Sequence, residues 1–234
     1  MMEVKKEPSL AELDTYIFVD ASNIRSACLK TLGWRLDFGK LAWHFTNKYR
    51  HLQEMRYYEG IAQDDWKKRK TFRKLKEVGY KICSLKRKSY TDELIMEDDV
   101  ACDSCGASQS VVLTKEVTKL KSNVDVYLAS ELLKTAFLAK RPVHIILVAC
   151  DGDYAEMIKC ALSVNRNVCI TVIATPVVPL ITLPNGKTKN INSCSTRLQA
   201  LKGKKNPRFY LTDIRDIQDY IQEQKWGRSR SNVL

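Results

Sequence analysis

The chain has 234 residues, 44% hydrophobic and 28% charged, which is typical of a globular protein and excludes extensive disorder. Lysine and arginine number 39 against 27 acidic residues, and the resulting net charge of +12 indicates a polyanionic partner such as nucleic acid. No apolar run approaches the roughly 20 residues of a membrane span, and the first residues lack the apolar centre of a secretion signal, so we expect a cytoplasmic protein without membrane contact.

Strands and helices alternate in the first third of the chain. The apolar run at 15–20 predicts a strand, and the helix after it begins near Ile24 with Ser22 or Asn23 as its cap. The next predicted elements are a helix, a strand, a helix and a strand, at 36–49, 54–61, 64–79 and 80–85. This order is typical of α/β proteins with a parallel sheet.

The alternation breaks at 86–124, which we interpret as an insertion that contains a hairpin and the Cys-x-x-Cys pair. It resumes with a helix, a strand, a helix, a strand, and a final strand and helix, at 124–140, 143–150, 152–165, 167–175 and 207–222. The pattern predicts an α/β fold with a mainly parallel sheet and helices on both faces. The expected domain spans 15–222, with an N-terminal extension at 1–14, a long loop at 176–195 and a tail at 223–234.

Aspartates stand at the ends of predicted strands and at the start of a predicted helix. Asp20, Asp151 and Asp153 follow strands, and Asp125 opens the helix after the insertion. Because ligands of parallel sheets bind beyond the carboxyl ends of the strands, we expect these four side chains to share one cleft. Capping of the following helix is the alternative role for each aspartate taken alone, and Asn23 is either a cap or a neutral metal ligand.

Four carboxylates in one cleft need a counter-ion. Two like charges about 4 Å apart repel by roughly 4 kcal/mol at an effective dielectric constant near 20. Mg²⁺ and Mn²⁺ favour sites made of oxygen atoms, and beside a phosphodiester such a cation activates water for in-line attack. The acidic residues therefore predict metal-dependent hydrolysis of a nucleic-acid backbone.

Three separated motifs, YIFVDASNI, NVDVYLASELL and IILVACDGDYAEMI, resemble those of the NYN domains, the LabA-like branch of the PIN-related nucleases. The similarity spans about residues 15–174. The resemblance implies a PIN-like three-layer sandwich and an Mg²⁺- or Mn²⁺-dependent ribonuclease site at Asp20, Asn23, Asp125, Asp151 and Asp153. The chain has Ala149-Cys150 where the family usually has Ser-Gly, and Ser122-Asn123 where it often has Lys-Gly, although Lys121 is adjacent.

The insertion carries a fragment of a zinc site. Cys102 and Cys105 have the spacing of two thiolates on one tetrahedral zinc, and the nearest further thiol is Cys83. Three arrangements remain open: zinc held with Cys83 and another group, zinc shared between two subunits of a homodimer, or no metal.

Positive charge is concentrated between residues 66 and 90, where eleven lysines or arginines accompany a single acid. Lys67, Lys70 and Lys74 are spaced to share one face of a helix, which is suited to contacts with phosphates. The predicted RNA contacts are completed by Arg25, Arg87, Lys88 and Lys121, with Tyr90 as a candidate for base stacking.

These observations predict a metal-dependent endoribonuclease that acts on RNA, in particular single-stranded RNA. The alternative on the same fold is a non-catalytic RNA-binding or regulatory adaptor, which the replacements at Ala149, Cys150 and Ser122 favour. RNA binding without turnover in Mn²⁺ would distinguish the adaptor from the enzyme.

Overall fold

The computed structural model describes residues 9–101, 104–105, 108–176, 181–182, 188–189, 194–202 and 206–223. Its centre is a six-stranded sheet in the order β10-β7-β6-β1-β2-β3, and every neighbouring pair is parallel. The strands are β1 Asp14–Asp20, β2 Leu52–Ile61, β3 Tyr80–Lys86, β6 Val143–Val148, β7 Val168–Ala174 and β10 Phe209–Asp213. The prediction of a mainly parallel sheet is confirmed.

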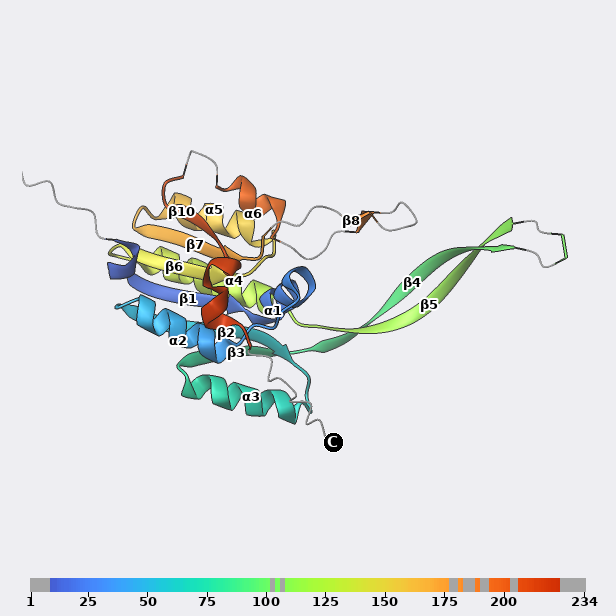
Figure 1. The fold of residues 1–234 in the computed structure, drawn as a ribbon, viewed down its shortest axis with the longest axis horizontal. Helices are drawn as coiled ribbons and strands as arrows, with labels where there is room; N and C mark the ends of the chain where they lie inside the picture. The colour runs from blue at the N-terminus through green and yellow to red at the C-terminus, as the bar shows by residue number, and fades with distance from the viewer. Residues whose placement is uncertain are drawn as a thin grey trace, which may run out of the picture.

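Helices lie on both faces of this sheet and make three layers (Figure 1). The chain runs from β1 to β3 in one direction and from β6 to β10 in the other, so right-handed connections place the two sets of helices on opposite faces. One face carries α1 Ala21–Ala27, α2 Phe38–Lys48, α3 Trp66–Glu77 and α7 Gln218–Ile221; the other carries α4 Val124–Leu138 and α5 Tyr154–Val164. The α/β sandwich predicted from the sequence is confirmed.

Short elements complete the described chain. They are the 3-10 helices η1 Leu10–Glu12 and η3 Ile214–Ile217, the π-helical turn η2 Cys28–Leu32, the two-stranded ladder of β8 Ile181–Thr182 and β9 Thr188–Lys189, and α6 Thr196–Ala200. Near the C-terminal end, Leu36 and Gln222 form an antiparallel bridge, and the Asp37 N–H donates to the Ile221 carbonyl. These bonds hold α7 against the start of α2.

The core explains why the central strands are apolar throughout. All six residues of β6 are buried, because helices cover both sides of the sheet and neither face of this strand reaches water. On the helical layer, Leu41 and Phe45 of α2 are almost fully buried, as the four-residue spacing predicts. Among the described residues, no helix has the length and apolar character needed to cross a membrane.

The start of α1 differs from the prediction. The helix begins at Ala21, and its N-cap is Asp20, whose carboxylate accepts the Asn23 N–H at 3.2 Å. The prediction of Ser22 or Asn23 as the cap was wrong, because a carboxylate at the last strand position can accept an N–H of the first helical turn that follows it. Asp65 caps α3, as one of the two predicted alternatives.

The hairpin predicted within the insertion at 86–124 is present as a long antiparallel pair of strands. β4 Lys88–Ala101 and β5 Ser108–Lys121 pair over fourteen residues each, which corresponds to about 45 Å at 3.3 Å per residue. Figure 1 shows this ribbon extending away from the sheet. At its base, a Cβ on Gly60 would lie 2.1 Å from Ser122 Oγ, so glycine lets the returning end of the hairpin pass close to β2.

Several predictions concern residues whose structure is not described. Most of the proposed N-terminal extension and C-terminal tail, and much of the loop at 176–195, lie outside the described residues, as does Cys102.

Candidate active site

Two neighbouring strands end at the same edge of the sheet and bring the first acidic residues together. β1 ends at Asp20, β6 ends at Val148, and Val19 pairs with Val148 in parallel register. The chain departs from this pair of strands in opposite directions along the sheet, and in such sheets ligands bind at this point beyond the carboxyl ends. The Asp151-Gly152-Asp153 turn follows β6 directly at this edge.

Asp20 is the most buried acid of this edge, with 6% of its surface exposed. Its Oδ1 accepts bonds from the Asn23 N–H and the Ser22 hydroxyl, and its Oδ2 accepts one from the Tyr154 hydroxyl at 2.9 Å. Burial raises the pKa of Asp20, these three donors oppose the rise, and the charge of Asp151 adds to it. The carboxylate is thus fixed in position, while its charge is disfavoured.

Tyr154 is bonded to Asp20, and its pKa responds to the charges of two further predicted aspartates. Its pKa is raised, first by burial and then by the charges of Asp20, Asp125 and Asp151. Asp151 lies in the turn after β6, and Asp125 lies exposed in the first turn of α4. Because α4 begins at the carboxyl edge and runs back across the sheet to β6, its first turn lies near the acidic turn. Asp20, Asp125 and Asp151 therefore belong to the charged surroundings of Tyr154, although among the described residues no three such side chains are close enough together to share one metal.

Asp153 lies apart from these three acids. Its side chain is 84% exposed and is 3.5 Å from Arg197 Nη1, at the start of α6. Its backbone N–H donates to Asp151 Oδ1 at 3.1 Å, so the second acid of the pair shapes the turn through its main chain. Asn23 is also engaged elsewhere, because its Oδ1 accepts the Cys150 N–H at 2.7 Å and ties α1 to the end of β6.

Cys150 occupies one of the positions where the sequence departs from its resemblance. The thiol is buried and lies 3.3 Å from the Thr175 hydroxyl, so it faces the interior. Burial raises its pKa, and the charges of Asp20 and Asp151 raise it further. The residue adds a neutral thiol behind the acids and offers no hydroxyl to this edge of the sheet.

The donor set suits a magnesium or manganese ion bound by few protein ligands. In the described part of the chain, no three His, Cys, Asp or Glu side chains are close enough together to hold one metal. Mg²⁺ needs only one or two carboxylates and keeps several waters, and Asp20 retains acceptor capacity at Oδ2 beyond its three bonds. Asp20 and Asp151 fit such direct ligands, and Asp125 fits a contact through water.

Residues near Ser195 close the acidic turn from one side, which sequence reasoning missed. The Ser195 N–H donates to the Cys150 carbonyl at 3.0 Å, and a Cβ on Gly152 would lie 2.1 Å from Ser195 Oγ. Ser195 also caps α6 by accepting the Arg197 N–H. The glycine between two aspartates was the available signal, because glycine marks a close approach of another segment.

Replacing Gly152 with Ala is expected to destabilise the protein by about 1–3 kcal/mol, because the added methyl group collides with Ser195. Urea unfolding measures the change. Adding Ser195→Gly removes the obstructing side chain and itself costs only a few tenths of a kcal/mol at a helix cap, so the double variant should regain most of the loss. Equal destabilisation of the single and double variants would contradict this contact.

The cysteines predicted to hold zinc are far apart where they are described. Cys83 is buried in β3, and Cys105 is exposed at the far end of the hairpin. Fourteen residues of extended β4 separate that end from the sheet, so Cys83 and Cys105 do not meet within one chain. Cys102 lies outside the described residues, and the two-subunit arrangement stays a prediction.

The predicted RNA contacts divide between two cavities. Lys67 and Lys74 line a cavity of about 940 Å³ together with Arg25, whereas Lys70, although on the same helix, does not. Lys88 and Lys121 line a smaller cavity of about 280 Å³ with Tyr90, beside the base of the hairpin. Arg87 also lies at that base, where its Cγ would be 3.1 Å from a Cβ on Gly60.

Arg25 has a structural role that sequence reasoning missed. Its guanidinium pairs with the buried Glu59 at 2.8 Å, bonds the Tyr57 hydroxyl at 2.6 Å and lies over the Phe38 ring at 5.1 Å. Lys68 Nζ reaches the same Glu59 carboxylate at 2.9 Å. An acid inside an otherwise aromatic strand, in EMRYYEGI, was the available signal.

The family model of the NYN domain matches residues 14–197. A comparison with curated proteins finds no match. Among solved structures, the chain is similar to a crystal structure of a protein of unknown function from Vibrio parahaemolyticus, with a TM-score of 0.53 and 18% sequence identity. The similarity covers 92% of this chain and 99% of the other, and it shows that the two proteins share a fold.

Proposed function

The chain belongs to the NYN domain family of PIN-like nucleases, and from this membership we propose that it is an Mg²⁺- or Mn²⁺-dependent endoribonuclease. The observation that supports the proposal is the position of Asp20 at the carboxyl end of β1, bonded to the Tyr154 hydroxyl and beside the strand that leads to Asp151, at the edge of the sheet where ligands of such folds bind. A net charge of +12 suits a polyanionic substrate such as RNA.

The residues of this edge have distinct roles in the proposed reaction. When bound, the cation supplies charge neutralisation for a phosphodiester and activates water for its hydrolysis. Asp20 and Asp151 would hold it, and Tyr154 fixes the orientation of Asp20 through the bond to Oδ2. Asp153 and Arg197 have a structural role in this proposal: they pair with each other on the exposed side of the turn and stabilise its shape.

Removal of divalent metal is expected to stop cleavage of single-stranded RNA, because the three acids repel one another and the substrate without a cation. The measurement is cleavage of a labelled oligonucleotide with Mg²⁺ or Mn²⁺, with excess chelator, and after the metal is restored. Duplex RNA of the same sequence tests the preference for single strands. Cleavage that continues in excess chelator would contradict the proposal.

The adaptor alternative keeps a specific observation in its favour. Among the described residues, no three potential ligands converge on one point, and Cys150 brings no hydroxyl to the acidic edge. An adaptor would bind the same oligonucleotide and leave it intact in Mn²⁺, so binding and cleavage measured on one sample separate the two functions.

We assign the protein to a reducing compartment, the cytoplasm. The support is that Cys28, Cys83, Cys150 and Cys194 are buried free thiols, which a disulfide-stabilised secreted protein would not retain in this number.

A further inference from the structure

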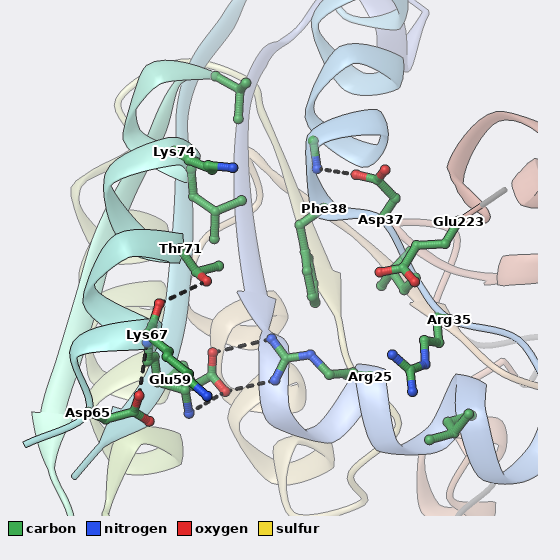
Figure 2. Close-up of a pocket in the computed structure, with 16 residues that line it drawn as sticks. Arg25, Arg35, Asp37, Phe38, Glu59, Asp65, Lys67, Thr71, Lys74 and Glu223 are labelled. Atoms are coloured by element: carbon green, nitrogen blue, oxygen red, sulfur yellow. Dashed lines mark hydrogen bonds and ion pairs between the residues drawn. The ribbon is translucent and has the colours of Figure 1, made fainter. Parts of the chain in front are cut away.

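A cavity lies between α3 on one side and α1 and the start of α2 on the other. Figure 2 shows it with Lys67, Thr71 and Lys74 of α3 facing Arg25 and Phe38 across an open space. Its volume of about 940 Å³ is within the upper range of ligand pockets in proteins. The nuclease mechanism uses none of these residues.

The floor of this cavity is a rigid network of charges. Glu59 is only 2% exposed and is bound by Arg25, Lys68 and the Tyr57 hydroxyl, at 2.8, 2.9 and 2.7 Å. Burial alone would raise the pKa of Glu59, but these partners lower it to about 2. The network contains two cations, Arg25 and Lys68, and one anion, Glu59, so its net charge is +1.

Arg25 is held in one orientation by this network. Glu59 and Tyr57 bind its nitrogens, and the Phe38 ring lies against its guanidinium. The side chain still exposes 41% of its surface. A fixed, partly exposed guanidinium plane is a surface on which an unpaired base stacks.

Further positive charge lies above this floor. Lys67 and Lys74 are exposed on α3, and within the described chain neither forms an ion pair. Two of the acids that line the cavity are engaged at helix starts, because Asp37 caps α2 and Asp65 caps α3. The helix α3 as a whole carries seven lysines or arginines and one glutamate. With Arg35 and Glu223, which also line the cavity, five cations accompany four acids, so the net charge of the lining is +1.

Apolar surface accompanies this charge. Leu29 and Val78 line the cavity and remain 49% and 43% exposed. A ligand that satisfies both features has a flat, largely apolar part and an anionic part, which is the character of a nucleotide.

The cavity is close to the acidic edge. Asp20 caps α1, and Arg25 lies five residues further along, which is a rise of about 8 Å along the helix axis at 1.5 Å per residue. Asp20 also pairs with Tyr58 in the sheet, next to Glu59. A strand bound at the acids can therefore continue over α1 into the cavity.

We propose that this cavity binds one unpaired nucleotide of the RNA strand, a few positions from the bond that is cut. The base lies against Arg25 and the apolar wall, and the neighbouring phosphates contact Lys67 and Lys74. The identity of the ligand rests on the proposed RNA function, whereas the site itself rests on the cavity and its charges. It explains a preference for single strands, since a paired base cannot enter.

The test is RNA binding without cleavage, in chelator, by fluorescence anisotropy of a labelled oligouridylate of about 12 nucleotides. Lys67→Ala with Lys74→Ala is expected to weaken binding about tenfold and to reduce the slope of log affinity against log salt by about 1.4. The matched control is Lys70→Ala with Arg73→Ala, which removes the same charge from the same helix outside the cavity and should weaken binding less. Thermal melting checks that both variants are folded.

Equal weakening by the two pairs would overturn the proposal, since α3 would then act as a uniform basic surface. Photo-crosslinking of an oligonucleotide that contains 4-thiouridine locates the base directly. Crosslinks to the peptides around Arg25 or Val78 support the site, and crosslinks confined to other parts of the chain overturn it. If the wild-type protein binds RNA at the cavity but never cuts it, the nuclease proposal fails and the nucleotide site stands. If the protein cuts RNA but the cavity variants have no effect on binding, the nucleotide site fails and the nuclease proposal stands.

Discussion

Replacing Asp20 with Asn is expected to reduce RNA cleavage at least about 100-fold and, at the same time, to raise the free energy of unfolding at neutral pH. The loss of activity follows from removal of a metal-binding charge. The gain in stability follows from the raised pKa of Asp20, caused by burial and by Asp151. Asn keeps the size of the side chain and is an equally good helix cap, so the bond to the Asn23 N–H is retained.

The sign of the stability change follows from proton linkage. A carboxyl group whose pKa is raised on folding binds protons more readily in the folded state, so its contribution to stability is present below the unfolded pKa of about 3.8 and is lost as pH rises through the folded value. At pH 7 the charged Asp20 therefore opposes folding. Asp20→Asn removes this opposition, and the gain over the wild type should vanish in acid.

Urea unfolding and single-turnover cleavage, measured on the same samples, test both effects. Added Mg²⁺ should raise the melting temperature of the wild type more than that of Asp20→Asn, because a ligand stabilises only the state that binds it. Glu156→Gln is the control, since this acid is 80% exposed in the first turn of α5 and pairs with Lys159. A variant at Asp20 that cuts RNA normally, or is less stable at pH 7, contradicts the assignment.

The fold and the position of Asp20 and Asp151 at one edge of the sheet were predictable because both depend on simple local patterns. Alternating apolar strands and amphipathic helices predict a parallel sheet, and in a parallel sheet all strands end at one edge. Asp20 and Asp151 follow strands that prove to be neighbours, β1 and β6. The family resemblance, confirmed by the NYN match over residues 14–197, rests on the same strand ends.

The roles of individual side chains were less predictable, because their partners are distant in sequence. Tyr154 and Asp20 are 134 residues apart, and Arg197 and Asp153 are 44 apart. Periodicity describes only neighbours within a few turns, so it gave no sign that Asp153 would pair outward while Asp151 stayed with the other acids. Asn23 likewise accepts the Cys150 N–H, and its side chain proved to tie α1 to the end of β6.

The hairpin shows a different limit of sequence reasoning. The acidic run at 91–99, TDELIMEDD, lacks a regular alternation of apolar and polar residues, and yet it lies within β4. Strand preference depends on the partner strand more than on the residues themselves. Its pairing over fourteen residues with β5, which carries lysines, was therefore not visible in either strand alone.

Replacing Glu59 with Gln is expected to lower the free energy of unfolding at pH 7 by about 3 kcal/mol. The pKa of Glu59 is about 2 in the folded protein against an ordinary value of 4.5 for glutamate, and each pKa unit corresponds to about 1.36 kcal/mol. Glutamine keeps the shape of the side chain but leaves Arg25 and Lys68 without their anion. The resulting penalty is of the size measured for broken buried pairs.

The pH dependence distinguishes this charge effect from a packing defect. Because the folded pKa of Glu59 is lowered, its stabilisation is present above about pH 4.5 and is lost as pH falls towards 2. The difference between the wild type and Glu59→Gln in urea unfolding should therefore shrink between pH 5 and pH 3. A difference that stays constant over this range would show that the variant fails for steric reasons.

Glu54→Gln is the matched control for Glu59→Gln on the same strand. Glu54 also pairs with two cations, Arg56 and Lys81, and its pKa is lowered by them against the opposing effect of burial. However, 24% of its side chain is exposed, so solvent screens the charges and the expected loss is below about 1 kcal/mol. Since Glu59 also holds Arg25 in place, Glu59→Gln should weaken RNA binding at the cavity as well, whereas Glu54→Gln should not. Loss of stability without any loss of binding would separate the buried network from the nucleotide site.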